Sequence, residues 1–362
     1  AGNPVFGNGI CPGWSSKKPI RQDIRPPSQE MEGSHWGPLP TEYGRWNGVY
    51  VHGNRAVLSY SISGTDIAEL PGVIRRDDQA IFTRALEVGE TSDTLFMNAA
   101  EVVGGSGGYT DGTVGYIYFG EGKDSVMAVG IQKNGADDAS VRFVEGRYLD
   151  IVVSPSAVPR ELTVFLCSGP LELLEGFNEE LQSARIQIPD FRKGGNGHWP
   201  GKVYTRGEIA PDTAAFVTDI LTLPVPNPWK RNMRVIDMAF LDNTTAVVST
   251  FEGDLWLVDG IIGNLGRMAW KRIASGLYEP MSIEVHAGQI YVFGKEGIIR
   301  LHDLNGDGEV DFYENFCDLM QEPPESYAWA ADMVFSGKDN SFIIALGAAV
   351  NARPGITRPI MT

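Results

Sequence analysis

Short apolar runs rich in Val, Ile, Tyr and Phe follow one another from Trp46 to about Ser168, and Gly, Asp or Pro residues separate them. This pattern is typical of antiparallel strands joined by turns, because β-branched and aromatic side chains suit a pleated surface, whereas Gly and Asp suit turns. A hairpin is predicted over 49–62 around a turn at Gly53-Asn54. Further strands are predicted at 80–88, 94–103, 114–119, 125–132, 140–145, 147–153 and 161–167. The regular spacing of the turns indicates an antiparallel β-sandwich.

Two segments of the N-terminal half, one before and one after these predicted strands, do not show the strand pattern. In 169–185 the apolar residues recur every three or four positions, which predicts a helix. Residues 1–45 have neither period and are rich in Pro, Gly and Ser, so an irregular N-terminal arm is expected there. We therefore assign 46–190 to a sandwich-like domain and 191–232 to a connector that leads into the second half.

The second half contains an internal repeat of apolar strand positions. Matching apolar residues stand 45 positions apart in the pairs Phe240 and Val285, Ala246 and Tyr291, and Val248 and Phe293. A third copy begins near Met333. A repeat of this length made of short strands is typical of β-propeller blades. We therefore predict an all-β chain in which 233–362 forms two to three blades of an incomplete propeller.

Within this repeat, residues 303–314 match the twelve-residue calcium loop of EF-hands. Oxygen-bearing side chains occupy loop positions 1, 3, 5, 9 and 12, and Gly308 stands at position 6, where the loop turns sharply. Ca²⁺ prefers six to eight oxygen ligands. The predicted ligands are the side chains of Asp303, Asn305, Asp307, Asp311 and Glu314, with the backbone carbonyl of Glu309. The alternative is an acidic surface turn that holds no metal.

The segments on either side of this loop do not predict the two helices of an EF-hand. Upstream, 289–294 and 297–302 have the composition of two short strands. Downstream, Phe312, Phe316 and Leu319 have the spacing of one apolar face of a short helical turn. We therefore expect an EF-type calcium loop inserted in a β-sheet, with a structural role for the metal.

Charge restricts the classes of ligand. The formal net charge of −16 argues against nucleic acids and against anionic membranes, and it favours a small neutral molecule or a glycan. No apolar run approaches the length of about 20 residues that a membrane span needs. Calcium is abundant outside cells, where even a calcium loop of low affinity is occupied. We therefore expect a secreted or periplasmic protein.

The cysteines exclude two further kinds of centre. Cys11, Cys167 and Cys317 are too few and too scattered for a disulfide framework or a zinc site, and the sequence leaves open whether two of them pair. No Cys-x-x-Cys-His motif occurs, so no covalent haem is expected in this chain.

Several motifs resemble a family of large secreted bacterial proteins. They are His198-Trp199-Pro200, Thr205-Arg206-Gly207-Glu208, 219–224, Asn227-Pro228-Trp229, Gly253-Asp254-Leu255-Trp256, 300–316 and, upstream, 48–60. In that family, a domain of unknown function precedes a propeller similar to quinoprotein glucose/sorbosone dehydrogenases, often with a c-type cytochrome module. The resemblance implies pyrroloquinoline quinone as a cofactor, a sugar or alcohol as substrate, and a c-type cytochrome as a partner.

A quinoprotein dehydrogenase needs a general base, usually His, and cationic groups around the quinone carboxylates. His198 in the connector is the first candidate for the base, and Arg206 is a candidate cation. His286 and His302 stand at the ends of predicted strands, so a structural role is favoured for both. The other candidate cations are Arg231, Arg234 and Arg300.

Three functions stay open from the sequence. The first is a quinone-dependent sugar or alcohol dehydrogenase, and the second is a non-catalytic scaffold that binds carbohydrate or protein. The third is a hydrolase that acts in a cleft between the domains. Because two to three blades do not close a ring, the remaining blades are expected from a longer polypeptide or from another chain.

Overall fold

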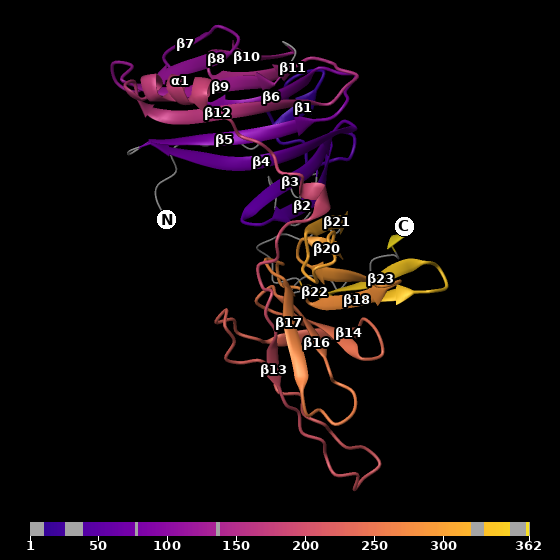
Figure 1. Cartoon of the computed structure of the whole chain (residues 1–362). Helices are drawn as coiled ribbons and strands as arrows, with labels where there is room; N and C mark the ends of the chain where they lie inside the picture. Colours follow the sequence, from indigo (N-terminus) through magenta and orange to yellow (C-terminus); the bar gives the residue numbers. More distant parts are fainter. Residues whose placement is uncertain are drawn as a thin grey trace. The chain divides into compact units, whose positions relative to one another are not determined.

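The computed structural model describes residues 11–25, 39–76, 79–134, 138–319, 329–347 and 360–361. These residues form antiparallel sheets, and α1 (Leu173–Ser183) is the one α-helix in the described part of the chain (Figure 1). The prediction of an all-β chain is confirmed to that extent. The chain divides into two compact units, Ala1–Tyr50 with Asn54–Phe191 and Val51–Gly53 with Arg192–Thr362.

The first unit contains two sheets that share one apolar core. The smaller sheet has the spatial order β1-β6-β11-β10, and the strands of the larger sheet that belong to this unit run in the order β2-β3-β4-β5-β12-β9-β8-β7. Their bounds are β1 (Trp14–Ser16), β2 (Gly44–His52), β3 (Arg55–Ile62), β4 (Thr65–Arg76), β5 (Gln79–Val88), β6 (Leu95–Glu101), β7 (Gly108–Thr110), β8 (Val114–Phe119), β9 (Ser125–Asn134), β10 (Ala139–Val144), β11 (Tyr148–Val153) and β12 (Arg160–Pro170). Met97 and Leu149 of the smaller sheet belong to the same buried cluster as Ile117 and Val164 of the larger.

Strand β12 shows why part of this sequence is apolar without alternation. Val164 faces the core shared with the smaller sheet, whereas Phe165 belongs to a second cluster with Phe177 and Leu181 of α1. The helix therefore covers the second face of the sheet (Figure 1). A Cβ on Gly130 of β9 would lie 2.7 Å from Leu181, so the glycine allows the helix to approach this closely.

The prediction of an irregular arm over 1–45 was wrong at β1. Trp14 is buried, pairs with Met97 of β6, and donates a hydrogen bond from its indole nitrogen to the Tyr60 hydroxyl at 3.0 Å. A three-residue strand is too short to show a period, so burial of the Trp14 ring, not local propensity, places it in the sheet. The remainder of the predicted arm at 1–10 and 26–38 lies outside the described residues.

The second unit repeats one pattern of strands. Each of its first two meanders has four strands paired in chain order, and a third sheet follows with the order β22-β23-β24. The first meander consists of β14 (Val235–Phe240), β15 (Thr245–Thr250), β16 (Leu255–Asp259) and β17 (Met268–Ala274). The second consists of β18 (Ser282–His286), β19 (Gln289–Gly294), β20 (Gly297–His302) and β21 (Phe312–Cys317). The third contains β22 (Trp329–Ser336), β23 (Ser341–Gly347) and β24 (Ile360–Met361).

The apolar cores of this unit lie between successive meanders. Val247 of the first meander shares a cluster with Val292 of the second, and Phe293 of the second shares one with Phe342 of the third. The first strands of successive meanders are in contact, β14 with β18 and β18 with β22. The repeat read from the sequence therefore corresponds to a structural repeat in which each meander buries its faces against its neighbours.

The segment before the first meander differs from the expected plain connector. It contains η1 (Phe191–Lys193) and β13 (Val203–Thr205), and β13 pairs with β17 as a fifth strand. Farther along, Leu221, Leu223 and Trp229 cover the free face of the first meander, where they pack on a cluster that includes Trp256. The connector therefore closes this face with apolar side chains.

Candidate metal centre

The predicted calcium loop joins the third and fourth strands of the second meander. Its first nine residues, 303–311, connect β20 to β21, and its last three lie within β21. The predicted helical turn after the loop was wrong, because 312–317 pairs with β20 and places Glu314 opposite Arg300. Pairing with a neighbouring strand therefore overrides the weak helical spacing of Phe312 and Phe316.

Side-chain oxygens of this loop hold its own backbone in turns. The two oxygens of Asp303 accept hydrogen bonds from the backbone N–H groups of Gly306 and Gly308, each at 2.8 Å. Asn305 Oδ1 accepts a hydrogen bond from Asp307 N at 2.9 Å. Asp307 Oδ1 accepts one from Glu309 N, also at 2.9 Å. Gly306 and Gly308 have φ values of 77° and 81°, a region that glycine adopts without strain.

Two other carboxylates of the loop are buried and bind the connector. Glu309 is 5% exposed and accepts hydrogen bonds from the backbone N–H groups of His198 and Trp199, at 2.5 and 2.7 Å. Asp311 is 6% exposed and accepts one from Gly195 N at 2.8 Å. These contacts satisfy carboxylates that would be costly to bury alone. We call the contact between segment 194–199 and this loop the connector clasp.

Glycines of the connector clasp leave no room for side chains. A Cβ on Gly194 would lie 2.7 Å from an oxygen of Asp311, and a Cβ on Gly197 would lie 2.7 Å from an oxygen of Glu309. A Cβ on Gly195 would lie 2.6 Å from the backbone nitrogen of Gly53. The glycines of this run are therefore explained by the close approach of two loop carboxylates and of the backbone at Gly53.

Glu314, the predicted bidentate ligand, is engaged elsewhere. Its carboxylate accepts hydrogen bonds from Arg300 at 2.6 and 3.0 Å, and it lies 2.6 Å from Nε2 of His302. Burial alone would raise the pKa of Glu314, but the bonds with His302 and Arg300 outweigh it, so the pKa is lowered. Coordination of calcium by Glu314 requires that this carboxylate leave both partners.

The structure separates the other candidate site residues. His198 is exposed, its ring lies 5.5 Å from that of Trp199, and its backbone meets Glu309 in the connector clasp. Arg206 is exposed and follows β13. His286 stacks on Phe335 with ring centroids 3.6 Å apart, which fits the structural role favoured from sequence.

A buried charge network around Asp254 contacts the connector at Trp199, and the sequence analysis did not predict it. Asp254 is fully buried and accepts hydrogen bonds from Arg231, Arg272 and Ser275 at 2.6, 2.6 and 2.7 Å. The guanidinium of Arg272 also lies over the ring of Trp199 at 4.1 Å. In the sequence, Gly253-Asp254 stands out only as part of the family resemblance. The residues around it do not indicate that two arginines distant in sequence bind the Asp254 carboxylate.

The loop has the donor chemistry that calcium requires. Asp303, Asn305 and Asp307 are exposed, and each carries oxygens beside the backbone turn that they stabilise. Hard oxygen donors in this order suit Ca²⁺. Within the described ranges, however, no three His, Cys, Asp or Glu side chains converge into a ready-made metal cluster. Metal binding would therefore draw the loop oxygens together.

Three of the four candidate cations for pyrroloquinoline quinone are paired with carboxylates. Arg231 pairs with Asp254, Arg234 with Glu252, and Arg300 with Glu314. These three arginines therefore do not form a ready cationic site for the carboxylates of the quinone, whereas Arg206 is exposed to solvent. Cys11 and Cys167 are free cysteines.

Comparison with known protein families matches the N-terminal part of the chain. Residues 1–69 are similar to a domain of unknown function, DUF6797. No curated protein and no solved structure matches the chain. Among the described residues, no helix is long and apolar enough to cross a membrane.

Proposed function

We propose that this chain is a calcium-binding, secreted or periplasmic scaffold in which a β-sandwich precedes blades of a β-propeller. The observation that carries the proposal is the loop 303–311, where side-chain oxygens at EF-type spacing hold a turn between two adjacent strands. Bound Ca²⁺ would be held by Asp303, Asn305 and Asp307 with the Glu309 carbonyl, and Asp311 would contribute directly or through water.

The propeller part of the proposal is supported by the packing of the second unit. Sheets of four strands in chain order, stacked face to face with their first strands in contact, have the topology of propeller blades. The sandwich part is supported by the two sheets of the first unit that share one core.

The connector clasp suggests what the metal stabilises. The same loop that would bind calcium also holds the backbone of 194–199 through Glu309 and Asp311. A metal that rigidifies this loop would therefore fix the connector on the second meander. This role is structural and needs no open coordination position for a substrate.

The test uses Ca²⁺ titration of the whole chain with Asp303→Asn as the variant. Asn keeps one acceptor oxygen for the loop but removes a charge, so calcium affinity is expected to fall about tenfold or more. Its amide nitrogen cannot accept the second backbone N–H bond, so stability in chelator is expected to fall by about 1 kcal/mol and is measured separately. Asp339→Asn, an exposed carboxylate in the turn after β22, is the matched control. We expect a wild-type Kd of order 10⁻⁴ to 10⁻³ M, the range of extracellular modules. Absence of binding at 10 mM calcium, about ten times the weaker limit, would refute the proposal.

The scaffold hypothesis is favoured over a quinone-dependent dehydrogenase because three of the four candidate arginines are paired with carboxylates. The dehydrogenase rests on the family resemblance. Reduction of an artificial electron acceptor that requires a sugar, added quinone and calcium, and that is lost in His198→Ala, would establish the enzyme and replace the scaffold hypothesis.

A further inference from the structure

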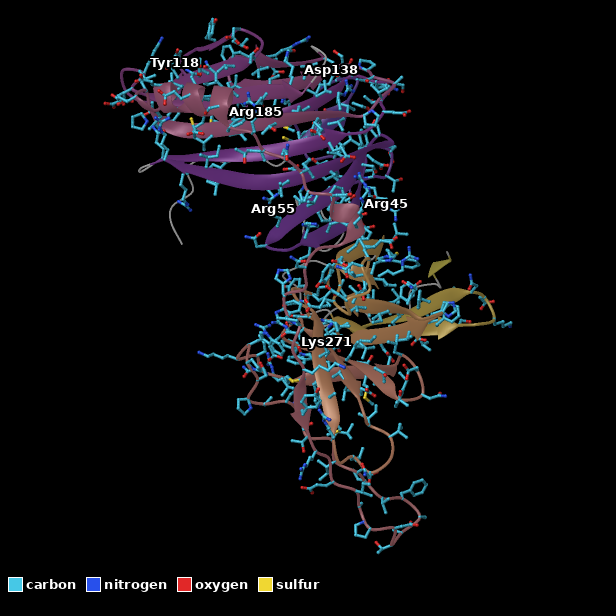
Figure 2. All side chains as sticks on the ribbon, in the orientation of Figure 1. Arg45, Arg55, Tyr118, Asp138, Arg185 and Lys271 are labelled. Carbon is cyan, nitrogen blue, oxygen red and sulfur yellow. The ribbon has the colours of Figure 1, made fainter. Side chains whose placement is uncertain are left out.

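The most exposed large apolar side chain of the described residues lies in a loop that the proposed calcium site does not use. Phe216 is 96% exposed. It stands in the long excursion between β13 and β14 (Figure 1), in which every residue from 211 to 220 is exposed. The side chains that this unit carries are drawn in Figure 2.

Phe216 is accompanied by other exposed apolar residues. Ile209 is 52% exposed, Val217 is 45% exposed and Ile220 is 54% exposed. Scattered apolar residues are common on protein surfaces, but a set of four within twelve positions of one loop is a candidate interaction site. None of them belongs to an apolar cluster of the second unit, so this face of the loop contributes nothing to the cores.

The loop has a defined base. Glu208 and Ile220 exchange both backbone hydrogen bonds, at 2.9 and 2.8 Å, and Ala210 N donates to Asp219 Oδ1 at 2.9 Å. A Cβ on Gly207 would lie 2.6 Å from the Ile220 carbonyl oxygen, so glycine is required for this closure. A loop that is closed before binding loses less conformational freedom when it binds.

The charges of the loop select the kind of partner. Between 207 and 229 the chain carries Glu208, Asp212 and Asp219 and neither Lys nor Arg. Loops that insert into membranes combine apolar tips with cationic residues that meet anionic headgroups, so these carboxylates oppose a membrane. They complement a protein surface that carries cations around an apolar pocket.

We propose that 207–221 is a docking loop that inserts Phe216 into an apolar pocket of a partner protein, with Lys or Arg at the rim of that pocket. Phe216 is then the anchor, and the carboxylates orient the loop on the partner. This inference is independent of the calcium site, because no residue of the loop contacts 303–314 in the hydrogen bonds and ion pairs of the described residues.

The first experiment places the photo-crosslinker p-benzoylphenylalanine at position 216 of the whole chain. The matched control carries it at Val103, which is 78% exposed in the first unit. Both proteins are irradiated with the soluble and envelope proteins of the source organism. We expect one abundant adduct from position 216 that is absent from position 103. Equal labelling from both positions, no adduct from position 216, or an adduct only with a second copy of this chain would overturn the proposal.

The second experiment measures the affinity of the purified partner for the whole chain. Phe216→Ser is expected to weaken binding about tenfold or more, as for a central anchor, whereas Val103→Ser leaves the affinity unchanged. Because the rim is charged, raising salt from about 50 to about 300 mM weakens binding several-fold. An affinity that is unchanged in Phe216→Ser or indifferent to salt contradicts the proposal. So does binding of the wild type to vesicles of neutral or anionic phospholipid that Phe216→Ser abolishes. Both variants replace exposed side chains, so equal melting temperatures confirm that folding is intact.

Discussion

The two units of this protein build their cores from different kinds of strand pairing. In the first unit, strands distant in sequence are neighbours, as where Trp14 pairs with Met97 and Leu86 with Leu162. In the second unit, each meander pairs its strands in chain order, and the cores lie between meanders. The first unit therefore depends on one core assembled from the whole domain, whereas the second depends on a series of contacts between neighbours.

The units also bury charge in comparable ways. In the first, Glu69 is 5% exposed and receives hydrogen bonds from Arg84 and from the Tyr60 hydroxyl. In the second, Asp254 is fully buried between two arginines. The first network lies across the adjacent strands β3, β4 and β5, whereas the second also draws in Arg231 from the connector before β14.

The largest effect is expected from Asp254→Asn, which tests whether the second unit loses stability alone. The substitution leaves Arg272 buried without its counter-charge, and removal of one member of such a network costs about 3–5 kcal/mol. Hydrogen exchange followed by mass spectrometry should show lost protection in β14–β17 and retained protection in β5 and β9. Asp259→Asn, an exposed carboxylate at the end of β16, should change neither. Equal loss in both units would mean that they unfold together.

The complementary change is Leu149→Ala in the first unit. Leu149 is fully buried in the core shared by the two sheets, so its truncation is expected to cost about 2–5 kcal/mol. Because that core is continuous, β6, β9 and β12 should lose protection together while the second unit keeps its own. The matched control is Val158→Ala, at a position that is 65% exposed. Loss confined to β11 would contradict a single cooperative core.

A smaller effect is expected in the connector clasp. Gly197→Ala places a Cβ against the Glu309 carboxylate and should cost about 1–2 kcal/mol. It should also shift the fluorescence of Trp199, whose backbone N–H binds the same carboxylate. Gly201→Ala is the control, because a Cβ there meets no atom within 4 Å. Identical spectra and stabilities for the two variants would show that the clasp contributes nothing.

The smallest effect concerns Glu314 and the acid side of the stability profile. Because its pKa is lowered in the folded state, the stabilisation is complete above the unfolded-state pKa of about 4.3 and is lost as pH falls through the folded-state pKa. Glu314→Gln should therefore lower the unfolding free energy near pH 7 by about 1 kcal/mol or less, as for partly exposed ion pairs. The difference from wild type should shrink as the solution is acidified. A difference that stays constant from neutral to acid pH would exclude this ionic contribution.

Many strands were predictable because their signal is local. The predicted strands 289–294 and 297–302 coincide with β19 and β20, and the helix predicted in 169–185 contains α1. Apolar residues at strand or helix spacing mark the faces that must be buried, whatever buries them. The strands missed by the same reading include β1, β7 and β13, which have three residues each, and the twelve-residue β4, in which Pro71 and Gly72 interrupt the strand composition. Strands β1 and β13 lie in the sheets because distant segments pair with them.

The sequence by itself determined the strand-rich character of the chain, the repeat of the second unit and the residue types of the predicted calcium loop, since each can be read from residue identities and their spacing along the chain. Only the tertiary structure decided what the loop carboxylates do. Glu309 binds the backbone of His198, 111 positions away, and Glu314 is held by Arg300 on the adjacent strand. A hydrogen bond across such a separation leaves no period in the chain, because it depends on how sheets stack and not on which residues adjoin.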